Sequence, residues 1–177
     1  MNILNSIESA AGNVENYLGS FLPSNSTTYT AAPATSTINP QKLASSIAYN
    51  ETRGEQNPYS FKQYSGSSTI GNANGKYQIT DAELKAYAPR FLGTQITPQQ
   101  FLNNPSLQDR YINTKIQSLA NRRLTPEQIL AVHRGGMSDL TPQGLSARVQ
   151  QYQPYVTAGM NQYNATSSPQ IMPLTKK

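Results

Sequence analysis

Three Thr-Pro pairs divide the second half of the chain, and a run of residues with helical spacing follows each pair. The pairs begin at Thr97, Thr125 and Thr141, in the segments TPQQ, TPEQ and TPQG. Proline suits the first turn of a helix, where its missing N–H has no partner to lose. Each segment therefore predicts a helix start, and the uneven spacing excludes a structural repeat. Starts of this kind constrain the chain to a mainly helical fold.

The other signals between residues 41 and 163 agree with a mainly α domain. Residues 40–54 begin with proline and end with glycine, which predicts a helix with a glycine C-cap. Residues 55–76 are rich in Gly, Ser, Asn and Tyr and predict a small irregular or hairpin-like lobe. A helix is expected over residues 80–93, with Thr80 or Asp81 as its N-cap. The next long helix is predicted from an apolar stripe made of Leu107, Tyr111, Ile112, Ile116 and Leu119.

The flanks of this domain have a different character. Residues 1–21 place apolar side chains on one helical stripe and predict a short amphipathic helix. Residues 22–40 are rich in Ser, Thr, Ala and Pro and predict a flexible linker. Residues 164–177 predict a loose C-terminal tail. A short amphipathic helix must dock on something, and the sequence leaves open whether residues 1–21 pack on their own domain or on a partner protein.

Composition limits the chemistry that this chain can perform. Among its 177 residues there is no cysteine and one histidine, which excludes disulfides, thiol nucleophiles and histidine-rich metal clusters. No metal and no cofactor are therefore expected. The net charge of +5 favours anionic partners such as cell-wall polymers. The basic residues are scattered, so nucleic-acid binding rests on charge alone and no specific nucleic-acid partner is predicted.

No apolar run approaches the roughly 20 residues that a membrane span requires, so no transmembrane anchor is expected. The first residues also lack a basic segment followed by a continuous apolar core. We therefore expect that the chain does not carry a secretory signal peptide.

Glu51 is the residue most suggestive of catalysis. It lies one turn after the apolar Ile47, in the last turn before Gly54, where the helix dipole is negative. Partial burial and the dipole both disfavour a charged carboxylate, so its pKa is expected to rise. A carboxyl that is still protonated near neutral pH can serve as a general acid. The alternative is an exposed glutamate at a helix end that pairs with Arg53.

Four segments strengthen the catalytic interpretation because they resemble, in order, the motifs of the soluble lytic transglycosylase family. These segments are ETRGEQNPYSF (51–61), NGKYQIT (74–80), AVHRGG (131–136) and YQPYVTAGM (152–160). Two departures from the family pattern occur. Thr52 replaces a serine in the first motif, and Val132-His133 replace Tyr-Asn in the third.

The resemblance implies a lysozyme-like fold, which is an α+β arrangement with a small irregular or β lobe. It implies cleavage of the β-1,4 bond between N-acetylmuramic acid and N-acetylglucosamine in peptidoglycan, with a 1,6-anhydro product. In such enzymes one glutamate, here Glu51, acts first as acid and then as base. Most glycosidases instead use two carboxyl groups. Glu55, Asp81 and Glu83 are the nearby candidates for a second one, so a hydrolytic muramidase stays open.

The resemblance also supplies candidate residues for substrate binding. Gln78 is a neutral amide that can bind an acetamido group without adding charge. His133 stands in the position of the family's asparagine and either preserves or weakens its role. Tyrosines suit sugar faces, although core packing is the alternative for each of them. The candidate substrate-binding residues are Gly75, Tyr77, Gln78, His133, Tyr155 and Tyr64, and Tyr152 is a further tyrosine considered.

A wall-cutting enzyme without a signal peptide needs another route to the wall. A bacteriophage virion provides one, because a virion is assembled in the host cytoplasm and acts in the periplasm of the next cell during genome entry. Residues 1–21 would then dock on a tail or internal virion protein. Two alternatives are a holin-released endolysin and a structural virion protein that uses the domain as a scaffold or wall-binding module.

Overall fold

Asn39 and Pro40 start the first helix that can be described. The Asn39 side chain accepts a hydrogen bond from the Lys42 backbone N–H at 3.0 Å, and helix α2 runs over Pro40–Thr52. The computed structural model describes residues 38–64 and 67–165. The predictions for residues 1–21, for most of the linker and for nearly all of the tail lie outside these described ranges.

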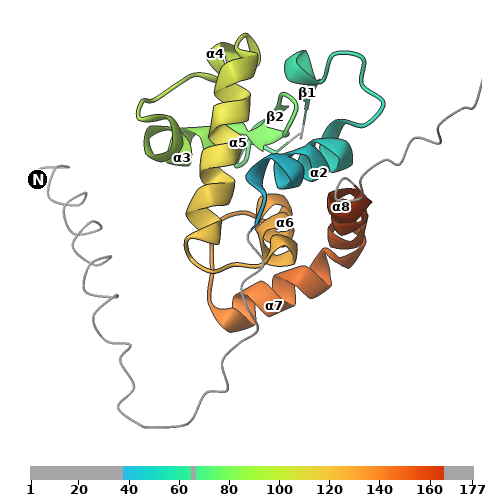
Figure 1. The fold of residues 1–177 in the computed structure, drawn as a ribbon. Helices are drawn as coiled ribbons and strands as arrows, with labels where there is room; N and C mark the ends of the chain where they lie inside the picture. Colours follow the sequence, from blue (N-terminus) through green and yellow to red (C-terminus); the bar gives the residue numbers. More distant parts are fainter. Residues whose placement is uncertain (1–37, 65–66, 166–177) are drawn as a thin grey trace, which may run out of the picture. The chain divides into compact units, whose positions relative to one another are not determined.

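The described chain is mainly helical, as the sequence predicts (Figure 1). Thr97, Thr125 and Thr141 are the N-caps of α4, α6 and α7, so the three Thr-Pro predictions are confirmed. No helix in the described ranges is long and apolar enough to cross a bilayer. After α2 the helices are α3 (Asp81–Leu92), α4 (Pro98–Leu102), α5 (Pro105–Ala120), α6 (Pro126–Gly135), α7 (Pro142–Gln151) and α8 (Gln153–Ala165).

The predicted lobe, residues 55–76, contains the first two strands of a small antiparallel sheet in the order β1-β2-β3, and the third strand follows it directly. After a 3₁₀ turn at Pro58–Ser60 come β1 (Lys62–Gln63), β2 (Ala73–Asn74) and β3 (Ile79–Thr80). Lys62 pairs with Asn74, and Ala73 pairs with Thr80. Because β3 leads directly into α3, the sheet is anchored at the start of that helix.

Helix α5 forms the centre of the packing (Figure 1). Four residues of its predicted stripe are completely buried, namely Tyr111, Ile112, Ile116 and Leu119, and the fifth, Leu107, is partly buried. Helices α2, α3, α4 and α6 all contact α5, while α2 and α6 also contact α8. This arrangement brings the end of α2, the lobe and the end of α6 around one region.

The boundary between β3 and α3 is held by Asp81, which the sequence left as one of two possible caps. The cap is Thr80, whose hydroxyl accepts from the Glu83 backbone N–H at 3.1 Å. Asp81 is the first helical residue, and its carboxylate accepts from Asn72 N–H at 2.8 Å and from the Asn74 side-chain amide at 2.7 Å. The suggestion that Asp81 caps the helix is therefore wrong, since its carboxylate holds the loop before β2 instead.

Replacing the α6 cap by Thr125→Ala is expected to destabilise the domain by about 1 kcal/mol. Thr125 and Gln128 form a capping box, in which the Thr125 N–H donates to Gln128 Oε1 at 2.9 Å. Urea unfolding should show a lower midpoint with an unchanged slope. Thr94→Ala, in an exposed loop, is the matched control. Equal midpoints for the two variants would contradict this role of the cap.

Candidate active site

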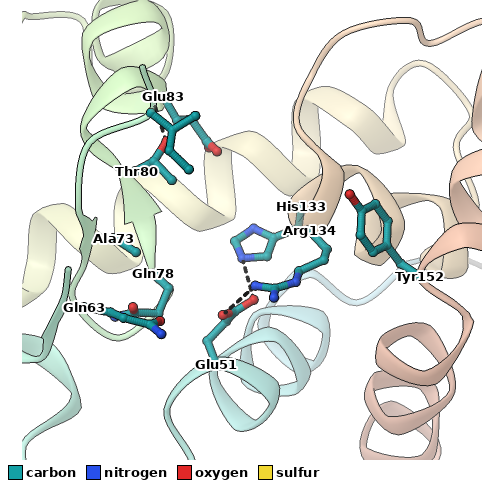
Figure 2. Close-up of a pocket in the computed structure, with 10 residues that line it drawn as sticks. Glu51, Gln63, Ala73, Gln78, Thr80, Glu83, His133, Arg134 and Tyr152 are labelled. Atoms are coloured by element: carbon teal, nitrogen blue, oxygen red, sulfur yellow. Dashed lines mark hydrogen bonds and ion pairs between the residues drawn. The ribbon is translucent and has the colours of Figure 1, made fainter. Parts of the chain in front are cut away.

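Glu51 lies inside the molecule, in the last turn of α2. Its side chain is 9% exposed, and Oε1 lies 3.7 Å from His133 Nε2 while Oε2 lies 3.9 Å from an Arg134 guanidinium nitrogen (Figure 2). Arg53 instead donates to the Tyr49 hydroxyl at 3.3 Å. The alternative of an exposed Glu51–Arg53 pair is therefore wrong, because the Glu51 carboxyl is buried and faces α6.

A pocket of about 360 Å³ opens above the Glu51 carboxyl. Its walls come from the end of α2, the lobe with its sheet, the start of α3, the end of α6 and the residue that follows α7 (Figure 2). These segments lie far apart in the chain, and the packing around α5 brings them together. The lining residues are Glu51, Gln63, Ile70, Ala73, Gln78, Thr80, Glu83, His133, Arg134 and Tyr152.

The pKa of Glu51 is raised above its ordinary value of 4.5, and burial is the main cause. A hydrogen-bonding interaction with Tyr155 and the positive charges of Arg134 and Lys115 act in the opposite direction but do not cancel the effect of burial. The rise agrees with the expectation from sequence. A buried carboxyl with a raised pKa at the wall of an open pocket can, in its protonated form, donate a proton to a bound molecule.

Tyr155 contributes a neutral hydroxyl beside this carboxyl. Burial and the nearby Glu51 charge raise the pKa of Tyr155 well above its ordinary value, so it stays protonated. Its hydroxyl oxygen is buried, and among the described residues no group completes a hydrogen bond to it in good geometry. The Arg134 guanidinium lies over its ring at 5.8 Å. The hydroxyl is therefore available to donate to Glu51 when that carboxyl loses its proton.

Gln78 lines the pocket with a side-chain amide that is held in place. Its backbone has φ of 49°, a left-handed conformation that is uncommon outside glycine and that marks strained sites. The side-chain Nε2 donates to the Gly75 carbonyl at 2.8 Å, which fixes the amide. Its Oε1 is buried and has no hydrogen-bond partner in the described part of the chain. An unsatisfied buried acceptor is costly, and a ligand N–H can satisfy it only if the Gln78 side chain moves to expose Oε1 to the pocket.

The three candidates for a second carboxylate differ in whether they line the pocket. Glu55 is exposed and Asp81 is held by the loop before β2, so neither lines the pocket. Glu83 does line it, but its Oε1 accepts from Lys115 Nζ at 2.6 Å and from the Tyr111 hydroxyl at 3.1 Å. Among the described acids, Glu51 and Glu83 alone reach the pocket, and Glu83 is already paired with a cation.

Four of the candidate substrate-binding residues are not among the residues that line the pocket in the described chain, namely Gly75, Tyr77, Tyr64 and Tyr155, although Tyr155 lies beside Glu51. Gly75 has φ of 71°, and a Cβ there would overlap the Gln108 side chain, so its role is to let the lobe approach α5. Tyr77 is buried, and its hydroxyl donates to Asp109 at 2.6 Å. Tyr64 is 78% exposed on the lobe, with Lys62 over its ring.

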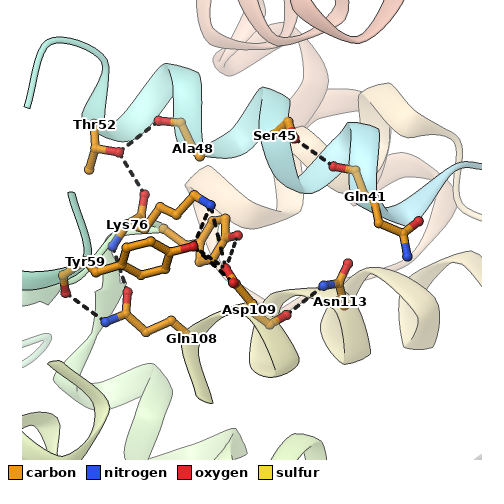
Figure 3. Close-up of polar contacts among 10 residues, drawn as sticks. Gln41, Ser45, Ala48, Thr52, Tyr59, Lys76, Gln108, Asp109 and Asn113 are labelled. Atoms are coloured by element: carbon orange, nitrogen blue, oxygen red, sulfur yellow. Dashed lines mark hydrogen bonds and ion pairs between the residues drawn. The ribbon is translucent and has the colours of Figure 1, made fainter. Parts of the chain in front are cut away.

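A polar cluster behind the pocket joins the lobe to α2 and α5 (Figure 3). The Thr52 hydroxyl lies 3.0 Å from the Ala48 carbonyl and 3.1 Å from the Lys76 carbonyl, and these two acceptors share its single proton. Lys76 Nζ donates to the Tyr59 hydroxyl at 2.9 Å, and that hydroxyl donates to Asp109 at 3.0 Å. Thr52, which replaces the serine of the resembled motif, thus fixes the end of α2 beside the loop that carries Gln78.

Sequence reasoning missed two cations at the site. Arg134 lines the pocket, and its position next to His133 was the available signal. The Lys115 side chain is 1% exposed, and its Nζ lies 3.4 Å from His133 Nδ1. Lys115 falls four residues after Tyr111, on the buried stripe of α5, so helical spacing could have identified it as a buried lysine.

Comparison of the chain with protein-family models, with curated proteins and with solved structures gave no match. The site must therefore be interpreted from its own geometry and from the motifs quoted above.

The difference in stability between Glu51→Gln and the wild type is expected to depend on pH. Because the folded-state pKa of Glu51 is raised, its contribution to stability is full below the unfolded-state pKa and is lost as pH rises through the folded-state pKa. The stability of Glu51→Gln relative to that of the wild type should therefore increase as the pH rises above about 4. Urea unfolding of both proteins across this range measures the change, and a difference independent of pH would contradict the burial argument.

Proposed function

We propose that residues 41–163 form a lysozyme-like peptidoglycan lytic transglycosylase that cleaves the bond between N-acetylmuramic acid and N-acetylglucosamine. The observation that carries this proposal is the Glu51 carboxyl, which is buried, has a raised pKa and lies at the wall of an open pocket. The four motif resemblances support the substrate class. The mainly helical fold with a small antiparallel sheet is compatible with a lysozyme-like arrangement.

In the first step of this mechanism, the Glu51 proton moves to the glycosidic oxygen as the bond from that oxygen to the muramyl C1 breaks. The N-acetylglucosamine chain leaves with a free 4-hydroxyl group. In the second step, the Glu51 carboxylate takes the proton of the muramyl 6-hydroxyl, whose oxygen bonds to C1 and closes the 1,6-anhydro ring. No water is consumed, and Glu51 ends protonated as it began.

The surroundings of Glu51 fit a residue that alternates between acid and base. Burial favours the neutral acid that starts the reaction, while Tyr155 and Arg134 favour the carboxylate that forms midway. Gln78 lines the pocket, and its Oε1, which is buried and has no partner among the described residues, can accept from the N–H of a substrate acetamido group once a small movement of the side chain exposes that atom. The groups around Glu51 thus favour both the neutral acid and the carboxylate, as a mechanism with one carboxyl requires.

A hydrolase is the second candidate, and one observation favours it: Glu83 lines the same pocket as Glu51. A hydrolase would need Glu83 to activate a water or to attack the sugar directly. The 2.6 Å contact with Lys115 works against this role, because the ammonium stabilises the Glu83 charge and occupies its Oε1. We therefore place the transglycosylase first.

The proposal is tested by incubating purified peptidoglycan sacculi with the wild type and with Glu51→Gln, and then measuring soluble glycan fragments and sedimented protein. The expected result is release by the wild type and binding without release by the variant. Wild type that co-sediments with sacculi but releases nothing would overturn the enzyme and favour the wall-binding module. Equal release by both proteins would overturn the role of Glu51.

We also propose a bacteriophage virion as the setting, with residues 1–21 docked on a tail or internal protein. This part rests on the amphipathic pattern and the linker composition of residues 1–40, which lie almost entirely outside the described residues. Peptide mass spectrometry of purified particles should find the protein at a fixed copy number that is lost when residues 1–21 are deleted. Particles without the protein would contradict this setting and favour an endolysin.

A further inference from the structure

A line of buried polar groups runs behind the pocket from α3 to Glu51. Lys115 Nζ lies 2.6 Å from Glu83 Oε1 and 3.4 Å from His133 Nδ1. The other ring nitrogen, His133 Nε2, lies 3.7 Å from Glu51 Oε1 (Figure 2). The side chains of Lys115 and His133 are 1% and 4% exposed, so both lie almost entirely inside the protein.

The chemistry of lysine decides which histidine nitrogen carries the proton. A lysine ammonium has three donors and no acceptor. Nδ1 can therefore interact favourably with Lys115 only as an acceptor, which leaves the proton of a neutral ring on Nε2. Lys115 also forms a close ion pair with Glu83. The buried pair thus specifies one tautomer of a ring that sits beside Glu51.

The groups around His133 also keep the ring neutral. Burial lowers the pKa of His133 well below its ordinary value of 6.5, and the charges of Lys115 and Arg134 lower it further. A backbone hydrogen bond with Tyr77 acts in the opposite direction without reversing the effect. The groups that face the ring are Lys115 on α5, Arg134 on α6, Glu51 on α2 and the Tyr77 backbone in the lobe, with Glu83 on α3 behind Lys115.

We propose that Lys115, held by Glu83, fixes His133 as the Nε2–H tautomer and so directs a neutral N–H donor at the Glu51 carboxyl. His133 is then a positioning residue, and this inference rests on the proposed function of Glu51. The 3.7 Å separation exceeds a hydrogen bond, so the donor is close to Glu51 without bonding to it. It becomes useful when Glu51 has given up its proton, because an N–H donor stabilises a carboxylate and not a protonated acid.

The direct test is NMR of the protein labelled with ¹⁵N-histidine, since the chain has a single histidine and every ring signal belongs to His133. Long-range proton–nitrogen correlation spectra distinguish the two tautomers and the doubly protonated ring. The expected spectrum has a protonated Nε2 and a bare Nδ1 from about pH 6.5, the ordinary pKa of histidine, to about pH 8. A bare Nε2, a mixture of tautomers, or a doubly protonated ring in this range would overturn the proposal.

The part played by Lys115 is tested in the same spectra with the double variant Lys115→Met/Glu83→Gln, which removes the donor without leaving a buried charge. The other tautomer should then become populated. A ring that keeps a pure Nε2–H form would show that Lys115 does not set the tautomer. These spectra need no activity, so the proposed function could fail while this inference stands, and the reverse is also possible.

The link to Glu51 is tested by comparing His133→Asn with His133→Leu on sacculi. Asparagine can still present a neutral N–H, so its rate is expected within about tenfold of the wild type, while leucine should lose about 10- to 100-fold. The leucine variant should also show a raised pKa in its pH–rate profile, because the Glu51 carboxylate loses a donor. Equal rates and equal profiles for the two variants would overturn the positioning role.

Discussion

Glu51→Gln is expected to lower the rate of peptidoglycan cleavage by about 10²- to 10⁴-fold, the usual contribution of a general acid or base. Glutamine matches the shape of the side chain, but its amide is too weak an acid and too weak a base to transfer the proton. The variant should fold normally, since the carboxyl is buried and favoured in its neutral form. Initial rates of soluble glycan release, measured at equal protein concentration, determine the loss.

Glu55→Gln is the matched control for this prediction. It makes the same chemical change four residues away, on an exposed side chain outside the pocket. Its rate should equal that of the wild type. If the two variants lost activity equally, or if Glu51→Gln stayed within about tenfold of the wild type, Glu51 would not be the acid and base of the reaction.

Lys115→Met is expected to cost the largest amount of stability, about 3 kcal/mol of the free energy of unfolding. The substitution keeps the apolar stem but removes the ammonium that neutralises Glu83 at 2.6 Å. A carboxylate without its partner in a nearly dry site is strongly unfavourable. The Glu83 side chain keeps 13% exposure, which is why we expect the lower end of the usual range. Urea unfolding at neutral pH measures the loss.

The double variant Lys115→Met/Glu83→Gln should recover most of this stability, because no buried charge is then left unpaired. Lys85→Met, on an exposed position of α3, is the control for loss of a lysine charge and should have little effect. If the double variant were as unstable as the sum of its single substitutions, the pair would not be coupled. The ion pair would then not account for the burial of Lys115.

Local patterns in the sequence predicted the elements of this fold because their causes are local. The Thr-Pro pairs work through capping hydrogen bonds within one turn, and the stripe on α5 works through the spacing of side chains along one helix. The Gly-rich and Asn-rich lobe was expected to be irregular or hairpin-like, and it contains two short strands that pair as a hairpin, with a third strand just after it. Local patterns also placed Glu51 on the inner face of its helix.

The site itself depends on contacts that no local pattern records. Glu51, Lys115 and His133 come from three helices, and only the packing of α2 and α6 around α5 brings them together. The sequence offered Gly75 as a substrate-binding residue, whereas its positive φ and its closeness to Gln108 give it a role in the lobe. The sequence also offered Tyr77 as a substrate-binding residue, whereas its hydroxyl donates to Asp109.

The most direct test of the central claim, that Glu51 alone acts as acid and then base, is the mass of the muropeptide ends made by the wild type. Our account predicts fragments lighter by one water than reducing-end muropeptides, because the muramyl 6-hydroxyl replaces water as the nucleophile. These fragments should be absent from a parallel digest with Glu51→Gln. Fragments with ordinary reducing ends would contradict the one-carboxylate mechanism and would make Glu83 the next residue to replace.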